Sequence, residues 1–220
     1  MRRANRWRLS TSAQYLRIVS MRVLHFYKTA FPDTNGGIEQ VIHQLARGGE
    51  AFGVEASVLS LTHEKTSRAF KIDNYHAHRA RMNFEIASTG FSASAFLQFK
   101  QLAKQADVIH YHFPWPFMDL VHFATRLKKP TVLTYHSDII RQKHLLKLYQ
   151  PLMQRFLSSV NRIVMTSPNY SETSNAVSCF SEKTSVIPIG IDKASYPLVS
   201  SERLAYWQKK GGKKGCLFVS

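Results

Sequence analysis

The sequence is poor in the residues that define several specialised protein classes. Its two cysteines, Cys179 and Cys216, lie far apart and lack the paired spacing of zinc or iron–sulfur ligands. This excludes a disulfide scaffold and fits a reducing compartment. Glycine (10) and proline (8) are too scarce for a collagenous or low-complexity chain, and no apolar run approaches the roughly 18 residues of a membrane-spanning helix. The remaining composition is ordinary for one large or two small globular domains, with 44% apolar residues among 220.

Acidic residues are also scarce, because 14 Asp and Glu face 30 Lys and Arg, a formal net charge of +16. The excess lies toward the ends of the chain, with five arginines and no acid in residues 1–20 and twelve basic against five acidic residues in 131–220. Such a chain favours an anionic partner, which can be nucleic acid, an anionic membrane surface or a phosphorylated substrate. The sequence has no RRM, KH, zinc-finger or helix-turn-helix pattern, so we expect no nucleic-acid partner.

Residues 1–20 form a basic segment that stands apart from the rest. It has neither the apolar centre of a secretory signal nor a periodic apolar pattern, and Met21 directly precedes the first strand-like run. We expect a disordered tail, or a segment upstream of a true start at Met21. The alternative is an anchor on an anionic surface, with Trp7 and Leu9 placed among the arginines.

From Met21 onward, short apolar runs alternate with amphipathic stretches. This alternation is typical of a parallel sheet covered by helices on both faces, and right-handed crossovers then give a doubly wound, mostly parallel, Rossmann-like α/β domain. Helices are expected at 37–47, 93–105, 117–127, 142–160 and 169–178. Strands are expected at 22–27, 55–61, 107–112, 131–136, 162–166 and 185–188, with a weaker one at 75–81.

The pattern changes after residue 188. Residues 189–206 are predicted to be a linker, 209–215 a polar basic turn, and 216–219 a buried strand. We expect that strand to open a second domain that this chain does not contain. The predicted organisation is a basic tail at 1–20, a Rossmann-like domain at 21–192, and a linker with the first strand of the absent domain at 193–220.

Ligands of doubly wound sheets bind beyond the carboxyl ends of the strands, and the loops predicted there are rich in Gly, His, Pro and aromatic residues. Gly36 and Gly37 lie between the first strand and the first helix, where glycines let backbone amides approach an anion at a helix N-terminus. The motif is not G-x-G-x-x-G, so a dehydrogenase is disfavoured. An ordinary strand-to-helix turn remains the alternative.

Histidines gather in the same loops. His136 follows the strand at 131–136 and could bind a substrate hydroxyl or stabilise charge, although a structural role bonded to backbone is the alternative. His110 and His112 are predicted to point to opposite faces of their strand, with His112 nearer the crevice and His110 in the core. We expect no metal site, because no third ligand stands at helical spacing.

Residues 141–162 carry five Lys or Arg, one His and no acid. An apolar stripe is predicted to face the core, with Pro151 as a kink. The basic face opposite this stripe could lie on an anionic membrane. The residues of the stripe are Leu145, Leu148, Leu152, Phe156 and Val160.

With these motifs in order, the chain resembles the N-terminal domain of the family-4 (group 1) retaining glycosyltransferases of GT-B fold. The resemblance covers about residues 21–192, and six short motifs keep their order and spacing over that length. They are 22–24 (RVL), 36–41 (GGIEQV), 107–112 (DVIHYH), 132–138 (VLTYHSD), 162–168 (RIVMTSP) and 186–192 (VIPIGID).

The resemblance implies roles for particular residues. Gly36 and Gly37 would contact the donor diphosphate, and His136 would reach the transferred sugar. The domain would hold the acceptor, a glycan or lipid-linked sugar, on the cytoplasmic face of the cell membrane, and no metal cofactor would be needed. The remaining candidates for binding the acceptor or the sugar are His112, Trp115, Asp138 and Glu39.

Two functions follow as expectations. The first is a hexosyltransferase that uses a nucleotide-diphosphate sugar and a membrane- or lipid-linked acceptor, incomplete and inactive as this chain alone. The second is a non-catalytic module that binds acceptor and membrane and is completed by a separate donor-binding domain. Nucleophilic catalysis is disfavoured, since G-x-S-x-G and P-loop motifs are absent.

Overall fold

The computed structural model describes residues 20–139, 143–174, 176–190 and 199–211. The chain divides into two compact units, Met1–Pro188 and Ile189–Ser220, which we describe separately. The predicted tail, apart from Ser20, and the predicted strand at 216–219 lie outside the described residues.

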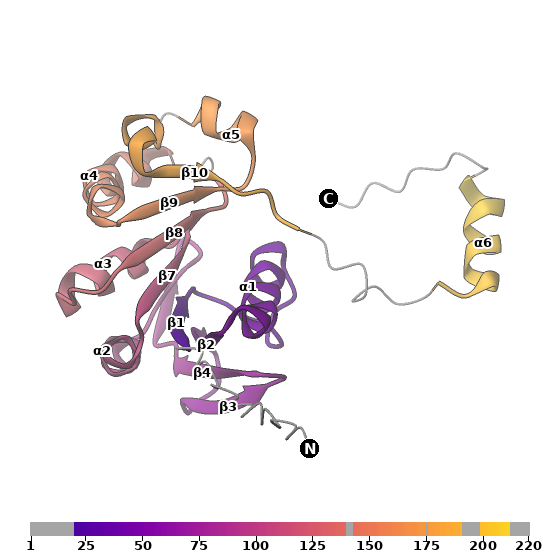
Figure 1. Cartoon of the computed structure of the whole chain (residues 1–220), viewed down its shortest axis with the longest axis horizontal. Helices are drawn as coiled ribbons and strands as arrows, with labels where there is room; N and C mark the ends of the chain where they lie inside the picture. The colour runs from indigo at the N-terminus through magenta and orange to yellow at the C-terminus, as the bar shows by residue number, and fades with distance from the viewer. Residues whose placement is uncertain (1–19, 140–142, 175, 191–198, 212–220) are drawn as a thin grey trace, which may run out of the picture. The chain divides into compact units, whose positions relative to one another are not determined.

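The first unit is built on an eight-stranded sheet of order β10-β9-β8-β7-β1-β2-β4-β3 (Figure 1). Every neighbouring pair is parallel except β3 and β4. All seven predicted strands occur in this sheet, and the predicted doubly wound, Rossmann-like fold is confirmed. The strands are β1 (Met21–Phe26), β2 (Val54–Thr62), β3 (Arg68–Ile72), β4 (Tyr75–Arg81), β7 (Val108–Phe113), β8 (Thr131–Tyr135), β9 (Arg162–Met165) and β10 (Thr184–Val186).

Helices cover both faces of the sheet: α1 lies on one face, and α2, α3 and α4 lie on the other (Figure 1). Phe26 of β1 packs against Phe99 of α2, with ring centroids 4.8 Å apart. Because side chains alternate along a strand, His25 faces the side of α1. The helices are α1 (Gly37–Gly48), α2 (Ala93–Gln105), α3 (Pro116–Thr125), α4 (Lys143–Ser159) and α5 (Pro168–Thr173), with 3-10 turns at Gly49–Phe52 and Ser178–Lys183.

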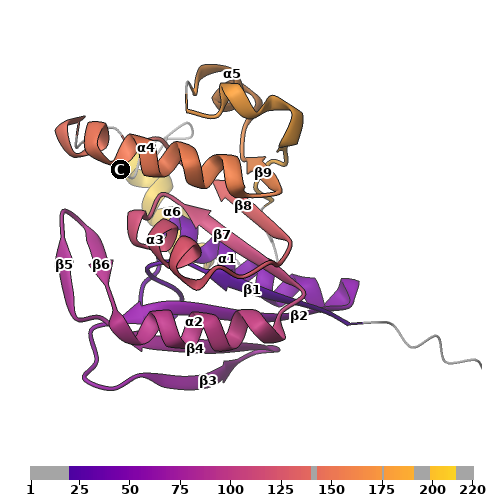
Figure 2. The ribbon, with the colours of Figure 1, turned by 90° about the vertical axis from the view of Figure 1, so that its left-hand side faces the viewer.

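Three strands were not expected from the sequence. One is β3, an edge strand, and the others are β5 (Phe84–Ile86) and β6 (Thr89–Phe91), a hairpin separate from the main sheet (Figure 2). The hairpin turn places Ala87 and Ser88 at φ 50° and 60°. Tight hairpin turns with positive φ usually carry Asn or Gly, so this sequence lacks the signal that would have revealed the turn.

The predicted core stripe of α4 is partly wrong. Phe156 and Val160 are buried, but Leu148 is 82% exposed. The buried face of the helix instead contains Met153, Phe156 and Leu157. One residue corresponds to a rotation of about 100° around a helix, so the observed face is rotated from the predicted stripe by about one residue. Leu148 is therefore an exposed apolar residue on a basic helix.

In the second unit, the prediction of a linker is wrong at residues 201–206 and that of a polar turn is wrong at residues 209–211, while residues 191–198 and 212–215 lie outside the described residues. Residues Ser201–Gly211 form the helix α6. The Ser200 hydroxyl accepts a hydrogen bond from the backbone N–H of Arg203 at 3.3 Å, as an N-cap residue does. Among the described residues, no helix is long and apolar enough to cross a membrane.

Candidate functional site

The site lies where the strand order reverses, with β1 placed between β2 and β7. Loops that follow β1, β7 and β8 meet at this carboxyl edge, where α/β sheets bind ligands. Two cavities open there, each of about 420 Å³, and Lys28 and Ser88 line both. The first extends over the ends of β1 and β2, and the second lies between the β5–β6 hairpin and the loops after β7 and β8.

The glycine loop leads into α1. Gly36 is the N-cap residue, without a side-chain cap, and Gly37 begins the helix. A Cβ at Gly37 would meet no atom within 4 Å, so the space beside this residue at the start of the helix is open. The first amides of a helix carry partial positive charge and lack intrahelical acceptors. Gly37, one of the two predicted diphosphate-binding residues, therefore lies at a helix start beside open space, whereas Gly36 lies against the Glu39 carboxylate.

Glu39 stabilises this loop through hydrogen bonds. Its Oε1 atom accepts hydrogen bonds from the hydroxyls of Thr29 (2.7 Å) and Thr34 (3.0 Å), and a Cβ at Gly36 would clash with its Oε2. The sequence makes Glu39 a candidate for binding the acceptor or the sugar. In the structure, its carboxylate turns toward the loop that precedes its own helix.

A second buried contact, which the sequence does not predict, holds the same loop. Arg79 of β4 is fully buried and pairs with Asp33 at 2.8 Å. It also donates to the carbonyl of Phe31 at 2.6 Å, so both ends of its guanidinium hold the loop after β1. No local pattern could have revealed this pair, because 46 residues separate the partners.

His136 directly follows β8 and is half-buried. Its backbone N–H donates to the carbonyl of Phe113 at 3.2 Å, and its Nε2 lies 3.2 Å from Nδ1 of His112. Burial lowers the pKa of His136 to about 4, and the Glu39 carboxylate opposes this shift. His136 is therefore neutral at physiological pH and can either donate or accept one hydrogen bond at its remaining nitrogen.

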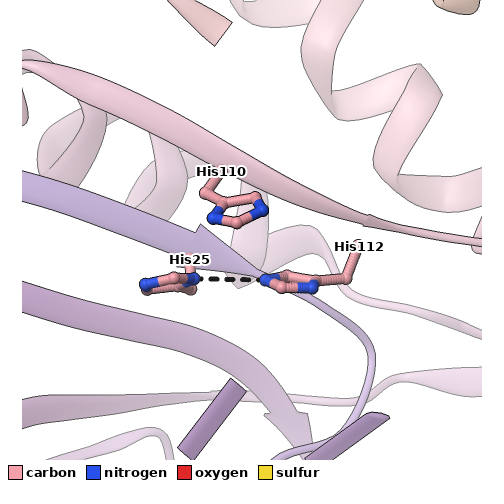
Figure 3. Close-up of side chains that lie close together, drawn as sticks. All are labelled: His25, His110 and His112. Atoms are coloured by element: carbon pink, nitrogen blue, oxygen red, sulfur yellow. Dashed lines mark hydrogen bonds between the residues drawn. The ribbon is translucent and has the colours of Figure 1, made fainter. Parts of the chain in front are cut away.

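The predicted placement of His110 and His112 on opposite faces is wrong. Their rings lie on the same face, with centroids 4.5 Å apart, because residues two apart on a strand share a face. His25 of β1 joins them from the neighbouring strand (Figure 3). His112 is fully buried, so it contacts His136 from the interior of the protein.

Trp115 and Asp138 border the second cavity. Trp115 is 1% exposed, and its indole N–H donates to the carbonyl of Gly90 at 3.2 Å, so most of the ring belongs to the core. Asp138 accepts hydrogen bonds from the hydroxyls of Tyr135 (2.6 Å) and Ser174 (3.0 Å). Both of these candidates therefore shape the cavity wall through bonds within the protein.

Comparison with known proteins relates this geometry to a family. A sequence model described as Glycosyltransferase Family 4 matches residues 35–195. The D-rhamnosyltransferase WbpZ of Pseudomonas aeruginosa is 54% identical over 199 residues, which cover 90% of this chain and 52% of that protein. The O-antigen chain mannosyltransferase C of Escherichia coli is 46% identical, with coverage of 90% and 53%. The chain thus spans about half the length of these curated relatives.

Solved structures agree on the fold. Sucrose-phosphate synthase from Thermosynechococcus elongatus superposes with a TM-score of 0.61 at 15% identity, over 86% of this chain and 52% of that one. HepE of Anabaena, solved with UDP-glucose, gives 0.53 at 16% identity, over 87% and 50%. The expected family resemblance is confirmed, and the chain belongs to glycosyltransferase family 4.

Proposed function

We propose that this chain is the acceptor-side half of a hexosyltransferase that builds a bacterial surface polysaccharide of the O-antigen type. The observation that carries the proposal is the meeting of the open glycine loop and neutral His136 at one sheet edge, in a chain 54% identical to a D-rhamnosyltransferase. A nucleotide-diphosphate sugar is the proposed donor, and a lipid-linked glycan is the proposed acceptor.

The proposed donor sugar has the manno configuration. One relative is named for mannose and another for D-rhamnose, which is mannose without its 6-hydroxyl. A donor pocket that serves this pair must recognise the ring hydroxyls that the two sugars share.

The proposed mechanism relies on positioning and on charge stabilisation. Negative charge develops on the diphosphate as it leaves, and the proposed groups that stabilise it are the first amides of α1, next to open space at Gly37, and Lys28, which lines the cavity over the ends of β1 and β2. His136 would hold the transferred sugar through a hydroxyl. We propose transfer with retention and without a metal cofactor, on the basis of family membership.

The proposed setting is the cytoplasmic face of the cell membrane, with the protein bound peripherally and without a nucleic-acid partner. The net charge of +16 supports attraction to anionic lipid. Exposed Lys147, Leu148 and Arg155 give α4 both the basic and the apolar groups of an interfacial helix.

A fusion of this chain to the remaining half of the P. aeruginosa D-rhamnosyltransferase tests the proposal. Incubation with nucleotide-diphosphate mannose or D-rhamnose and a lipid-linked acceptor should extend the acceptor by one hexose, detected by mass spectrometry. NMR of the product reports whether the anomeric configuration is retained, and an assay with a chelator tests the metal independence.

His136→Ala in this fusion should lower the rate of transfer by about a hundredfold or more, as the loss of one preorganised hydrogen bond to the reacting group does, whereas His76→Ala, at an exposed position on β4, should leave the rate unchanged. A folded fusion that binds acceptor but transfers no sugar would overturn the proposal. That result would support the second expectation, a non-catalytic module that binds acceptor and membrane.

A further inference from the structure

Three histidines from three adjacent strands form a line of hydrogen bonds. Nδ1 of His25 lies 3.1 Å from Nε2 of His112, and Nδ1 of His112 lies 3.2 Å from Nε2 of His136. The line runs from β1 through β7 to the end of β8, so it connects the interior of the sheet with the residue proposed to hold the sugar. Figure 3 shows the first of these bonds.

In each pair, a nitrogen of one imidazole ring points at a nitrogen of the next. Their centroids are 5.4 Å apart for His25 and His112 and 5.5 Å apart for His112 and His136, with interplanar angles of 26° and 21°. These separations exceed the nitrogen–nitrogen distances by about two ring radii. The facing nitrogens therefore lie on the line between ring centres, as in an N–H···N hydrogen bond.

This geometry disfavours a metal ion at His25, His110 and His112, although one nitrogen of each lies within 4.8 Å of the others. Ligand lone pairs must converge on a metal. The facing nitrogens of His25 and His112 point at each other instead, and Nε2 of His110 is 2.7 Å from the hydroxyl of Thr134.

The number of protons on the three rings restricts which tautomers the line of histidines can adopt. A neutral imidazole has one N–H and one bare nitrogen, and each of the two bonds needs one N–H. If His112 donated at both nitrogens it would be a cation, and if it accepted at both it would be an anion. Three neutral rings therefore have two arrangements, with every proton on Nδ1 or every proton on Nε2.

We propose that His25 and His112 are positioning residues that lock the tautomer of His136. The inference rests on the proposed function, in which His136 contacts the sugar. When all protons are on Nδ1, the outer nitrogen of His136 donates to a substrate hydroxyl, and when all are on Nε2 it accepts. The environment of buried His25 thus decides whether the outer nitrogen of His136, two hydrogen bonds away, donates or accepts a hydrogen bond.

Burial supports the neutral state on which the proton count depends. His25 is 3% exposed and His112 is fully buried. Burial lowers the pKa of His25 to about 4 and that of His112 well below its usual value, where neighbouring histidines lower it further.

Two-bond ¹H–¹⁵N NMR of the ¹⁵N-histidine-labelled chain tests the lock, because protonated and bare imidazole nitrogens have well separated ¹⁵N shifts. At neutral pH, His25, His112 and His136 should show the same tautomer, whichever it is. Different tautomers among the three, or an imidazolium pattern at any of them, would overturn the proposal without the need for a variant.

His25→Phe provides the second measurement. Without His25 the line loses one end, and the ¹⁵N shifts of His136 should move from a single tautomer toward the average of both. His110→Phe is the matched control, since it removes a ring stacked on the same histidines but outside the line, and it should leave the His136 tautomer unchanged. Equal shifts in the two variants would show a general packing effect and overturn the lock.

Transfer by the fusion protein separates this inference from the proposed function. A shared tautomer together with full activity of His136→Ala would leave the line of bonds intact but remove its proposed role. If the three histidines showed different tautomers and His136→Ala lost most of the transfer activity, the role of His136 would be upheld and the tautomer lock overturned.

Discussion

Arg79 shows at the scale of one residue how the loop before α1 is held. Its guanidinium is fully buried against the carboxylate of Asp33, which Arg68 also contacts at 3.1 Å from a partly exposed position, where Arg68 pairs with Glu64 as well. The two arginines share one partner, and they differ in solvent access. Their contributions to stability should differ for that reason.

We predict that Asp33→Ala lowers the free energy of unfolding by about 3 kcal/mol, since it leaves a buried cation without its partner. Arg68→Ala should lower the free energy of unfolding by less than about 1 kcal/mol, because exposed ion pairs contribute little to stability. Urea denaturation followed by circular dichroism measures both values. Equal costs would show that burial of Arg79 does not govern this pair.

Gly37 offers a test of the proposed donor site. A side chain at this position meets no atom of the chain, so Gly37→Trp should fold normally and obstruct the space in front of α1. We predict at least a tenfold loss of nucleotide-sugar affinity in the fusion protein, equivalent to about 1.4 kcal/mol.

Gly48→Trp is the control for Gly37→Trp. It lies at the other end of α1 and is equally open, so it should leave the affinity unchanged. If both variants bound the nucleotide sugar with unchanged affinity in isothermal titration calorimetry, the diphosphate would lie away from the glycine loop.

At the scale of the element, the packing of α3 against α4 encloses an acid. Asp119 of α3 is fully buried and accepts a hydrogen bond from the hydroxyl of Tyr149 on α4. Its Oδ1 atom has no hydrogen-bond partner among the described residues. Burial raises the pKa of Asp119 well above its usual value, and the Tyr149 hydroxyl opposes this shift.

This pKa makes the helix pair sensitive to high pH. The unfolded chain releases the Asp119 proton above about pH 4 while the native protein keeps it, so a rise in pH favours unfolding. We predict that Asp119→Asn gains stability relative to the wild type by about 1.4 kcal/mol per pH unit, as long as the native carboxyl stays protonated.

Urea midpoints of both proteins at pH 5, 6.5 and 8 test this prediction. The difference between the variant and the wild type isolates Asp119 from the histidines, which titrate in both proteins. A difference that stays constant with pH would mean that the native carboxyl is already ionised.

At the scale of the whole molecule, the positive charge should draw the protein to anionic membranes. We predict that binding to vesicles rises with their anionic lipid content and falls with salt. Leu148→Asp on α4 should weaken it about fivefold, equivalent to the ~1 kcal/mol of one charge near such a surface.

Leu97→Asp is the matched control for the membrane prediction. Leu97 is also a highly exposed leucine, but it lies on α2, at the opposite end of the first unit from α4 (Figure 2). Vesicle co-sedimentation should show little change for this variant. Equal weakening by the two substitutions would mean that net charge alone, and not α4, directs the binding.

The order and type of most elements could be read from the sequence, because short apolar runs and amphipathic stretches are local signals. The glycine loop and His136 could also be placed at the carboxyl edge from the fold rule alone. The turn at Ala87 and Ser88 gave no such signal, since it carries neither Asn nor Gly. The face of α4 was misplaced because Leu148 satisfies the apolar spacing without being buried.

Local sequence patterns are enough to predict a doubly wound parallel sheet and the loops in which a ligand site forms, because hydrophobic periodicity and strand-end position act over short distances. Tertiary structure alone decided which side chains meet there. The register of β1, β7 and β8 pairs His25 with His110 and His112 with Thr134, so each bond of the line reaches the residue two positions further along the neighbouring strand. The fold of β4 against the first loop buries Arg79 beside Asp33. These contacts join residues up to 87 positions apart, and they depend on strand pairing, which no local pattern records.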